Sequence, residues 1–460
     1  MLSHLPKSPG LFLNSNAQNN ITKRVCYFLM FFGIAVTSFY LSYRMLDRFQ
    51  NANLFSVYPL FGEYIKNIIQ KGEFYGTCDM VTLCYAGRMP FVPYFMSAIA
   101  SIYNSIPFAF LVKNTIICFF LVKIFNQLIY NVRLKTITFL GIILVFFIPV
   151  NVGTMFDINH EEAYTWILLL LLFTSLIDCL ITQETRTNVI VMSVSLVSLI
   201  LLKSSYLYFV LAISIYLLLI LKNKINKLIP LGAVLSTMLL WGLFIYHDTG
   251  YFAVMSNMSS LNGINLYKGN NEYIAQYYPQ YHIDTLQEEK LYDVYKNIDF
   301  SNDEWKQNSY FNEKAKTYII NHPLETLELA RRKFMVFFLD INRNTIKKSL
   351  LAQIEKTSLI KGKIGDLLYM FFWSINRLVL WSAIWVAFYY TLSKKFNHFD
   401  WKKKLSIAYL CTIIFYSLPS LIGFALYRHV IPLIPISILF LVTVLWAKEN
   451  NTLSSDRRLT

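Results

Sequence analysis

The stretch FDINHEEAYTWILLLLLF, residues 156–173, sets a group of ionisable side chains directly against a long apolar run. The group consists of Asp157, His160, Glu161 and Glu162. The apolar run that follows has the roughly 20 residues that a helix needs to cross a membrane. Because charge is costly inside a bilayer, acids at the edge of a span indicate either a solvated loop or a polar cavity at the mouth of a helical bundle.

The composition favours a membrane protein. Of the 460 residues, 55% are hydrophobic and only 15% are charged, and long apolar runs recur along the chain. The net charge of +15 does not indicate nucleic-acid binding, because the basic residues cluster between the apolar runs, as the positive-inside rule expects. We therefore predict an all-α polytopic membrane protein that contacts membrane lipids and binds no nucleic acid. The predicted spans, about ten, are residues 25–45, 106–130, 136–153, 163–181, 189–202, 206–221, 229–246, 367–391, 405–424 and 430–447.

This topology places the long loops on one face, where they are expected to form a small mixed subdomain. A semi-apolar stretch, 90–104, is expected to lie along the membrane. Cys78 and Cys84 share the first outer loop, and they either form a disulfide in an oxidising compartment or remain free thiols. The predicted divisions are a cytoplasmic N-terminus (1–24), a transmembrane module with catalytic outer loops (25–246), a large periplasmic loop (247–366), C-terminal transmembrane helices (367–447) and a cytoplasmic tail (448–460).

Several carboxylates of the outer face are candidates for acid–base chemistry. Glu63 opens EYIKNIIQKG (63–72), a helix-like segment, and is placed either to accept a proton from a hydroxyl group or simply to be solvated. Asp47 competes for the same role. Asp157 and Glu161 are the other candidates, and the DINHEE sequence leaves a divalent ion as an alternative. The chain has no P-loop, no dinucleotide-binding glycine fingerprint and no HExxH sequence.

Basic residues at the same face are candidates for binding a lipid phosphate. Arg88, in GRMP, carries a guanidinium that grips phosphate with two hydrogen bonds, although a lipid-facing arginine is the alternative. Lys113 lies inside a predicted span, where an isolated charge is expensive, so it is expected to face a polar cavity or an acid. Lys203 interrupts an apolar run, and Arg428 precedes His429 in a turn between two spans.

The order of these motifs resembles a known family. An acidic first loop is followed by GRMP (87–90) and HEEAYTW (160–166), and then by NGINLYKGNNEY (262–273), NEKAKTYIINHPLETLELARRKFMVFF (312–338) and YRHVIPLIP (427–435). This layout resembles the GT-C class of glycosyltransferases, especially the bacterial relatives of protein mannosyltransferases and aminoarabinose transferases. The chain departs from the family pattern at two points. Where the first loop of the family has a pair of acids, this chain has a lone GE (62–63), which leaves the identity of the base open, and its last turn reads RH instead of RY.

The resemblance implies an inverting transfer of one sugar from a polyprenyl-phosphate donor to a glycan, lipid or protein acceptor. The reaction would take place on the periplasmic face of the bacterial inner membrane. Glu63 would deprotonate or orient the acceptor hydroxyl, and Arg88, with Lys203 or Arg428, would stabilise the departing lipid phosphate. Sugar, acceptor or a divalent metal would be held by Glu161 or Asp157, with Glu162, His160 and His429 as further acceptor- or sugar-binding candidates.

Two other functions remain open at this point. A polysaccharide polymerase or ligase joins glycans at the same face with basic groups instead of a carboxylate base. A transporter of lipid-linked glycans needs no base, but it is expected to contain inverted repeats or interrupted helices in matching halves, which the sequence does not display.

Overall fold

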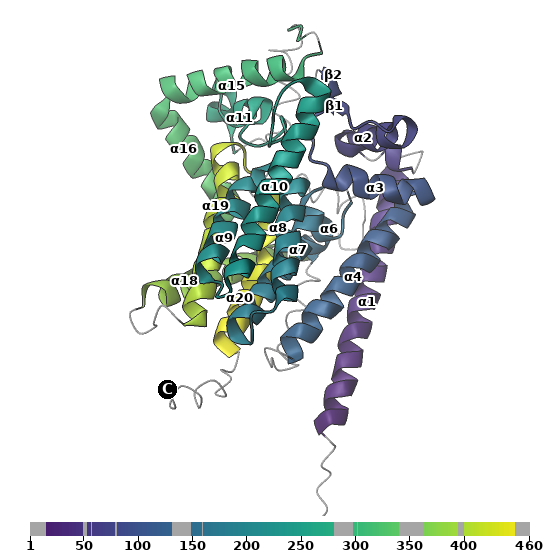
Figure 1. Ribbon diagram of the computed structural model, residues 1–460, viewed down its shortest axis with the longest axis vertical. Coiled ribbons are helices and arrows are strands. Elements are labelled where there is room, and N and C mark those ends of the chain that lie inside the picture. Colours follow the sequence, from purple (N-terminus) through teal and green to yellow (C-terminus); the bar gives the residue numbers. More distant parts are fainter. Residues whose placement is uncertain are drawn as a thin grey trace, which may run out of the picture.

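The protein is dominated by helices that run along one axis of the molecule, with shorter elements gathered at one end (Figure 1). The computed structural model describes residues 15–48, 53–56, 58–78, 81–130, 149–158, 160–279, 298–300, 302–339, 363–393 and 400–446.

Within these residues, six segments are long and apolar enough to cross a membrane. They lie in α4 (Ile106–Tyr130), α7 (Glu162–Ile181), α10 (Lys224–Thr249), α18 (Lys363–Leu392), α19 (Trp401–Ile422) and a last segment, Arg428–Leu445, that contains α20 (Leu433–Trp446). The prediction of an all-α polytopic membrane protein is thereby confirmed, whereas the number of ten spans stays a prediction. α7 is the central span, since 89% of its most apolar window is buried.

The remaining predicted spans differ from expectation in instructive ways. Residues 25–45 lie within the longer α1 (Ser15–Arg48), and most of 136–153 falls outside the described residues, apart from α6 (Pro149–Met155). The predicted spans at 189–202 and 206–221 form α8 (Arg186–Leu202) and α9 (Leu207–Ile220), which have 17 and 14 residues. Both are shorter than the roughly 20 residues of a straight span. They meet at the 3-10 turn η2 (Ser204–Tyr206).

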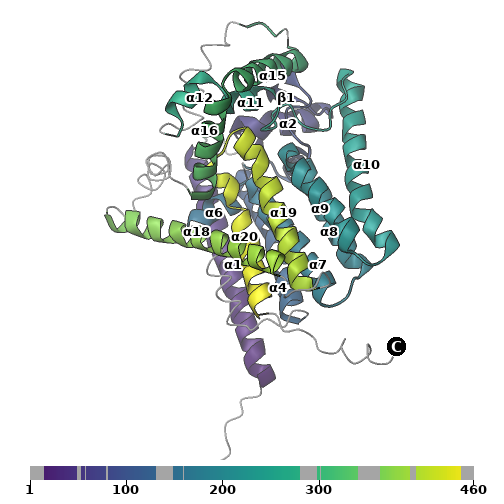
Figure 2. The same cartoon turned by 90° about the vertical axis from the view of Figure 1, so that its left-hand side faces the viewer.

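The long loops form a mixed subdomain at one end of the bundle (Figures 1 and 2), and the side of the membrane on which this end lies stays a prediction. Its first part contains η1 (Leu54–Ser56), α2 (Tyr58–Lys71), the antiparallel hairpin of β1 (Gly76–Cys78) and β2 (Val81–Cys84), and α3 (Phe91–Ile102). Its second part contains α11 (Gly263–Gly269), α12 (Glu272–Tyr277), α15 (Glu304–Asn321), α16 (Pro323–Phe334) and the π-helix η4 (Met335–Leu339).

A small buried apolar cluster joins these two parts of the subdomain. Cys78 and Cys84 form a disulfide that closes the hairpin, so the structure has the bridged form of the two alternatives. The bridged cysteines pack with Ile264 of α11 and Phe311 of α15 in a buried cluster. The hairpin is therefore fixed to two helices that begin 179 and 220 residues after its end.

Candidate functional site

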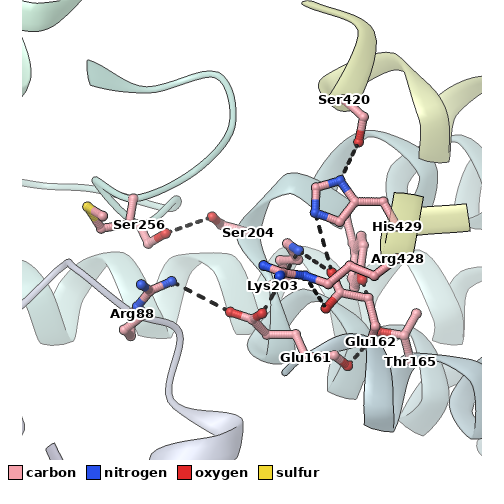
Figure 3. A network of polar contacts seen from close by, with 12 residues as sticks. Arg88, Glu161, Glu162, Thr165, Lys203, Ser204, Ser256, Ser420, Arg428 and His429 are labelled. Atoms are coloured by element: carbon pink, nitrogen blue, oxygen red, sulfur yellow. Dashed lines mark hydrogen bonds and ion pairs between the residues drawn. The ribbon is translucent and has the colours of Figure 1, made fainter. Parts of the chain in front are cut away.

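A cluster of buried and half-buried charged side chains lies where the mixed subdomain meets the bundle (Figure 3). Its centre is Glu162, in the first turn of α7, with 1% of its side chain exposed. Lys203 Nζ donates a hydrogen bond of 2.7 Å to Glu162 Oε1. Arg428 Nε lies 3.7 Å from Glu162 Oε2, and His429 Nε2 lies 3.7 Å from Glu162 Oε1. A buried carboxylate requires such partners, because an unpaired charge is strongly disfavoured in a dry interior.

Local sequence explains why these groups converge. Glu162 is placed by the start of α7, where a carboxylate interacts favourably with the helix dipole. Lys203 follows the last residue of α8 and is extended (φ −151°, ψ 118°), so its side chain leaves the helix at the bundle end. Arg428 lies in the 3-10 turn η5 (Tyr427–Val430), and Pro435 in the first turn of α20 is compatible with a helix start there.

Glu161 is the more accessible acid of the cluster, with 10% of its side chain exposed. Its two oxygens lie 3.7 Å from Arg88 Nη1 and 3.9 Å from Lys203 Nζ. Both distances exceed that of a direct hydrogen bond. No described residue donates a hydrogen bond to this carboxylate, in contrast to Glu162. Glu161 therefore retains acceptor capacity beside two cations.

Two carboxylates share three cations in the cluster. Three cations, from Arg88, Lys203 and Arg428, face the carboxylates of Glu161 and Glu162. Burial and the Arg428 guanidinium hold the pKa of the nearby His160 imidazole below its usual value, which disfavours a further positive charge there. A partly exposed site whose cations lie at long ion-pair distances from the acids is suited to an anionic ligand.

The structure assigns Lys113 and Asp157 to the support of the acidic loop. Lys113, buried on α4, donates a hydrogen bond to the backbone carbonyl of Asp157 and lies 5.1 Å from the ring centre of Tyr164. The Asp157 carboxylate accepts a hydrogen bond of 2.6 Å from the backbone N–H of Ile158, and lies 4.0 Å from His160 Nε2. In this structure Lys113 thus supports the acidic loop. It does not join Arg88, Lys203 and Arg428, with which the sequence analysis grouped it.

Glu63, the base that the resemblance implies, is not brought into the cluster. Its side chain is exposed on α2, and no hydrogen bond or ion pair joins it to any described residue. The same helix instead contributes the ring of Phe61, whose centre lies 5.9 Å from the Arg88 guanidinium. Asp47 lies at the end of α1, and its side chain is outside the described residues.

The structure also has an apolar groove of about 530 Å³. It lies between α3, α8 and α10, and its lining is Pro90, Phe91, Tyr94, Leu201, Thr237, Leu240, Trp241 and Phe244. Pro90 follows Arg88 by two residues, and Leu201 precedes Lys203 by two residues. The Nε1 of Trp241 is buried without a hydrogen-bond partner among the described residues. The groove and two of the cations are therefore held by the same two segments.

Among the described residues, one group of side chains is close enough together to bind a metal ion. Cys78, Cys84 and Glu304 bring their ligand atoms within 4.8 Å of one another, but the two sulfurs are joined in a disulfide and offer no thiolate. The described acids and histidine of DINHEE do not form such a group. A divalent ion at that loop stays a prediction.

No protein-family model, curated protein or solved structure matches this chain. The resemblance to GT-C glycosyltransferases therefore rests on the sequence motifs alone, and function has to be argued from the site.

Proposed function

We propose that this protein is a membrane glycosyltransferase that moves a sugar from a polyprenyl-phosphate donor to a glycan, lipid or protein acceptor. The proposed location of the site is the periplasmic face of a bacterial inner membrane. The observation that carries the proposal is that two short segments, 88–90 and 201–203, each hold a cation of the cluster and a lining residue of the apolar groove. An amphiphile with a phosphate head and an isoprenoid tail is the ligand class whose two parts match these two surfaces.

In this proposal the cations stabilise the leaving group. As the bond between the anomeric carbon and the phosphate oxygen breaks, its electron pair and the negative charge pass to the lipid phosphate. Arg88 and Lys203 have 18% and 20% of their side chains exposed, so a ligand could reach both cations. Preorganised cations that face a developing negative charge lower the barrier of such a reaction.

The acceptor hydroxyl requires a base, and Glu161 is better placed for this role than Glu63. Glu161 is partly exposed, accepts no hydrogen bond on its carboxylate from the described residues and lies beside the same two cations. It would take the proton of the hydroxyl as the oxygen attacks the anomeric carbon from the side opposite the phosphate. Glu162, fully buried and hydrogen-bonded to Lys203, would hold that cation in place.

Glu161→Gln tests this mechanism, because it keeps the shape of the side chain and removes the proton acceptor. With purified protein in lipid nanodiscs and a panel of polyprenyl-phosphate sugars, we expect transfer to fall by about 10²- to 10⁴-fold. Binding of farnesyl phosphate, a short polyprenyl phosphate, should persist. Glu63→Gln is the matched control and should leave transfer within about twofold of the wild type.

The two alternatives predict different results. A polymerase or ligase without a carboxylate base would retain transfer in both variants. A transporter would move a labelled lipid-linked glycan across vesicles without forming a glycoside. Loss of transfer in Glu63→Gln, but not in Glu161→Gln, would instead return the base to the first loop.

A further inference from the structure

One buried carboxylate lies outside the proposed mechanism. Glu304 is the first residue of α15 and is 4% exposed. Burial raises the pKa of its carboxyl, although hydrogen bonds from backbone N–H groups partly oppose this shift. No ion pair with a described lysine, arginine or histidine compensates its charge. Because burial of an unpaired carboxyl is unfavourable, its hydrogen bonds are expected to stabilise the segments around it.

Those contacts converge on the segment that leads to Arg88. Glu304 Oε1 accepts a hydrogen bond of 2.9 Å from the backbone N–H of Tyr85, and Oε2 accepts one of 3.1 Å from that of Ala86. Asn257 Nδ2 donates to the same carboxylate at 2.9 Å, while the backbone N–H of Asn257 donates to the carbonyl of Ala86 at 2.7 Å. The segment is thus held along both edges, and Arg88 follows Ala86 by two residues.

The disulfide supports this segment from beneath. A Cβ atom on Gly87 would lie 2.1 Å from Cys78 Sγ and 2.6 Å from Cys84 Sγ, so only glycine allows the backbone to approach so closely. Tyr64, on α2, donates a hydrogen bond of 2.9 Å to the carbonyl of Cys84. Glu304 Oε2 also lies 3.0 Å from Cys84 Sγ, a contact without a hydrogen bond, because a disulfide sulfur has no proton to donate.

The same set of hydrogen bonds extends to the segment of Lys203, the second cation. Ser256, which precedes Asn257, shares a hydrogen bond of 2.9 Å with the hydroxyl of Ser204 (Figure 3). Ser204 directly follows Lys203. The 256–257 segment therefore contacts the segments of both Arg88 and Lys203, and Glu304 joins that segment to the Arg88 side.

We propose that Glu304 is a positioning residue that sets the separation of Arg88 and Lys203 for a single phosphate group. The proposal rests on the proposed function and deepens it, since it assigns to α15 a role in the affinity for the polyprenyl-phosphate donor. Glu304 acts through the backbone of Tyr85 and Ala86, and it does not touch the substrate.

The test compares Glu304→Ala and Glu304→Gln with Glu313→Ala, which removes the same charge from an exposed position of the same helix. Hydrogen exchange of the peptide that contains Tyr85 and Ala86 measures directly how well Glu304 protects their backbone N–H groups. We expect exchange to become faster in Glu304→Ala, less so in Glu304→Gln, which keeps one acceptor oxygen, and to stay unchanged in Glu313→Ala. Unchanged exchange in Glu304→Ala overturns the proposal.

The second measurement is the Kd of farnesyl phosphate in a double-mutant cycle with Arg88→Gln. We expect Glu304→Ala to weaken binding about tenfold in the wild-type background and less than about twofold when Arg88 is already replaced. Full additivity would mean that Glu304 acts on overall stability and not through Arg88, which also overturns the proposal. If the wild type binds no farnesyl phosphate, the proposed function fails, whereas the exchange experiment still decides whether Glu304 holds the segment.

Discussion

The two ends of α7 each bury a carboxylate, but they surround it differently. Near the end of the helix, Asp178 accepts hydrogen bonds of 2.8 Å from Gln127, 2.9 Å from Asn188 and 2.6 Å from Thr182. All three donors are neutral. At the start of the helix, Glu162 is surrounded by Lys203 and Arg428, and one of its oxygens accepts no hydrogen bond from any described group.

This difference separates a structural polar cluster from a binding site. Neutral donors at hydrogen-bonding distance satisfy Asp178 and hold together α4, α7 and α8. At the other end three cations share two acids and lie mostly at 3.7 to 3.9 Å from them, so we expect an added anion to bind there. Burial of a carboxylate in a membrane bundle is therefore no sign of function by itself; its partners decide.

The largest effect should come from neutralising the two acids. Glu162→Gln removes the buried counter-ion of two half-buried cations, and we expect it to lower the free energy of unfolding by about 3 kcal/mol, the low end for a broken buried pair. Asp178→Asn disturbs hydrogen bonds to neutral donors, so it should cost about 1–3 kcal/mol. Thermal unfolding of both variants in detergent measures the difference. Equal losses would remove the distinction between the two ends.

A smaller effect is expected from removing one cation at each end of the bundle. Arg88→Gln should weaken farnesyl phosphate binding about 10- to 100-fold, because a charge-assisted hydrogen bond contributes about 1.5–3 kcal/mol. Arg186→Gln removes an exposed arginine at the start of α8, near Asn188 and the Asp178 cluster, and should leave the affinity unchanged. Isothermal calorimetry provides the comparison, and a similar loss in both variants would point to non-specific attraction.

Lys333 offers the most specific test of how partners set a buried charge. It is a buried cation with neutral partners, since its Nζ donates to Asn270 Oδ1 at 3.2 Å and to the carbonyl of Ile422 at 3.1 Å. Burial lowers its pKa to about 7. Between this value and the model-peptide value near 10.4, the unfolded chain binds a proton that the folded protein does not, so stability should rise with pH across this window. Melting temperatures from pH 7 to 10 should rise less in Lys333→Met than in the wild type, and parallel curves would contradict the prediction.

Much of the site could be predicted from the sequence, because charge next to an apolar run is unusual wherever it occurs. Glu161, Lys203 and Arg428 each stand at a span boundary, and the structure brings them together. The prediction for Glu63 relied on its position in the first loop and did not consider which face of the helix it occupies. Phe61, Tyr64 and Ile65 are buried with the spacing of one helix face, which turns Glu63 outward. That periodicity was present in the sequence and argues against a buried base at this position.

The remaining features depend on tertiary packing and leave no local signal. Glu304 contacts Tyr85, 219 positions earlier in the chain, and nothing around either residue indicates the other. Trp241 lines the groove only because α10 packs beside α3 and α8. The short α8 and α9 were predicted as ordinary spans, since apolar composition reports burial but does not give the point at which the chain turns.

The most direct test of the account is the affinity of the purified wild-type protein for farnesyl phosphate, compared with farnesol and inorganic phosphate. A single site that combines the cations and the groove predicts that farnesyl phosphate raises the melting temperature, with about 2.7 kcal/mol of stabilisation at a concentration of 100 times its Kd. Farnesol alone and inorganic phosphate alone should each raise the melting temperature much less. Equal stabilisation by farnesol, or none by farnesyl phosphate, would contradict the claim that the charged cluster and the apolar groove form one binding site.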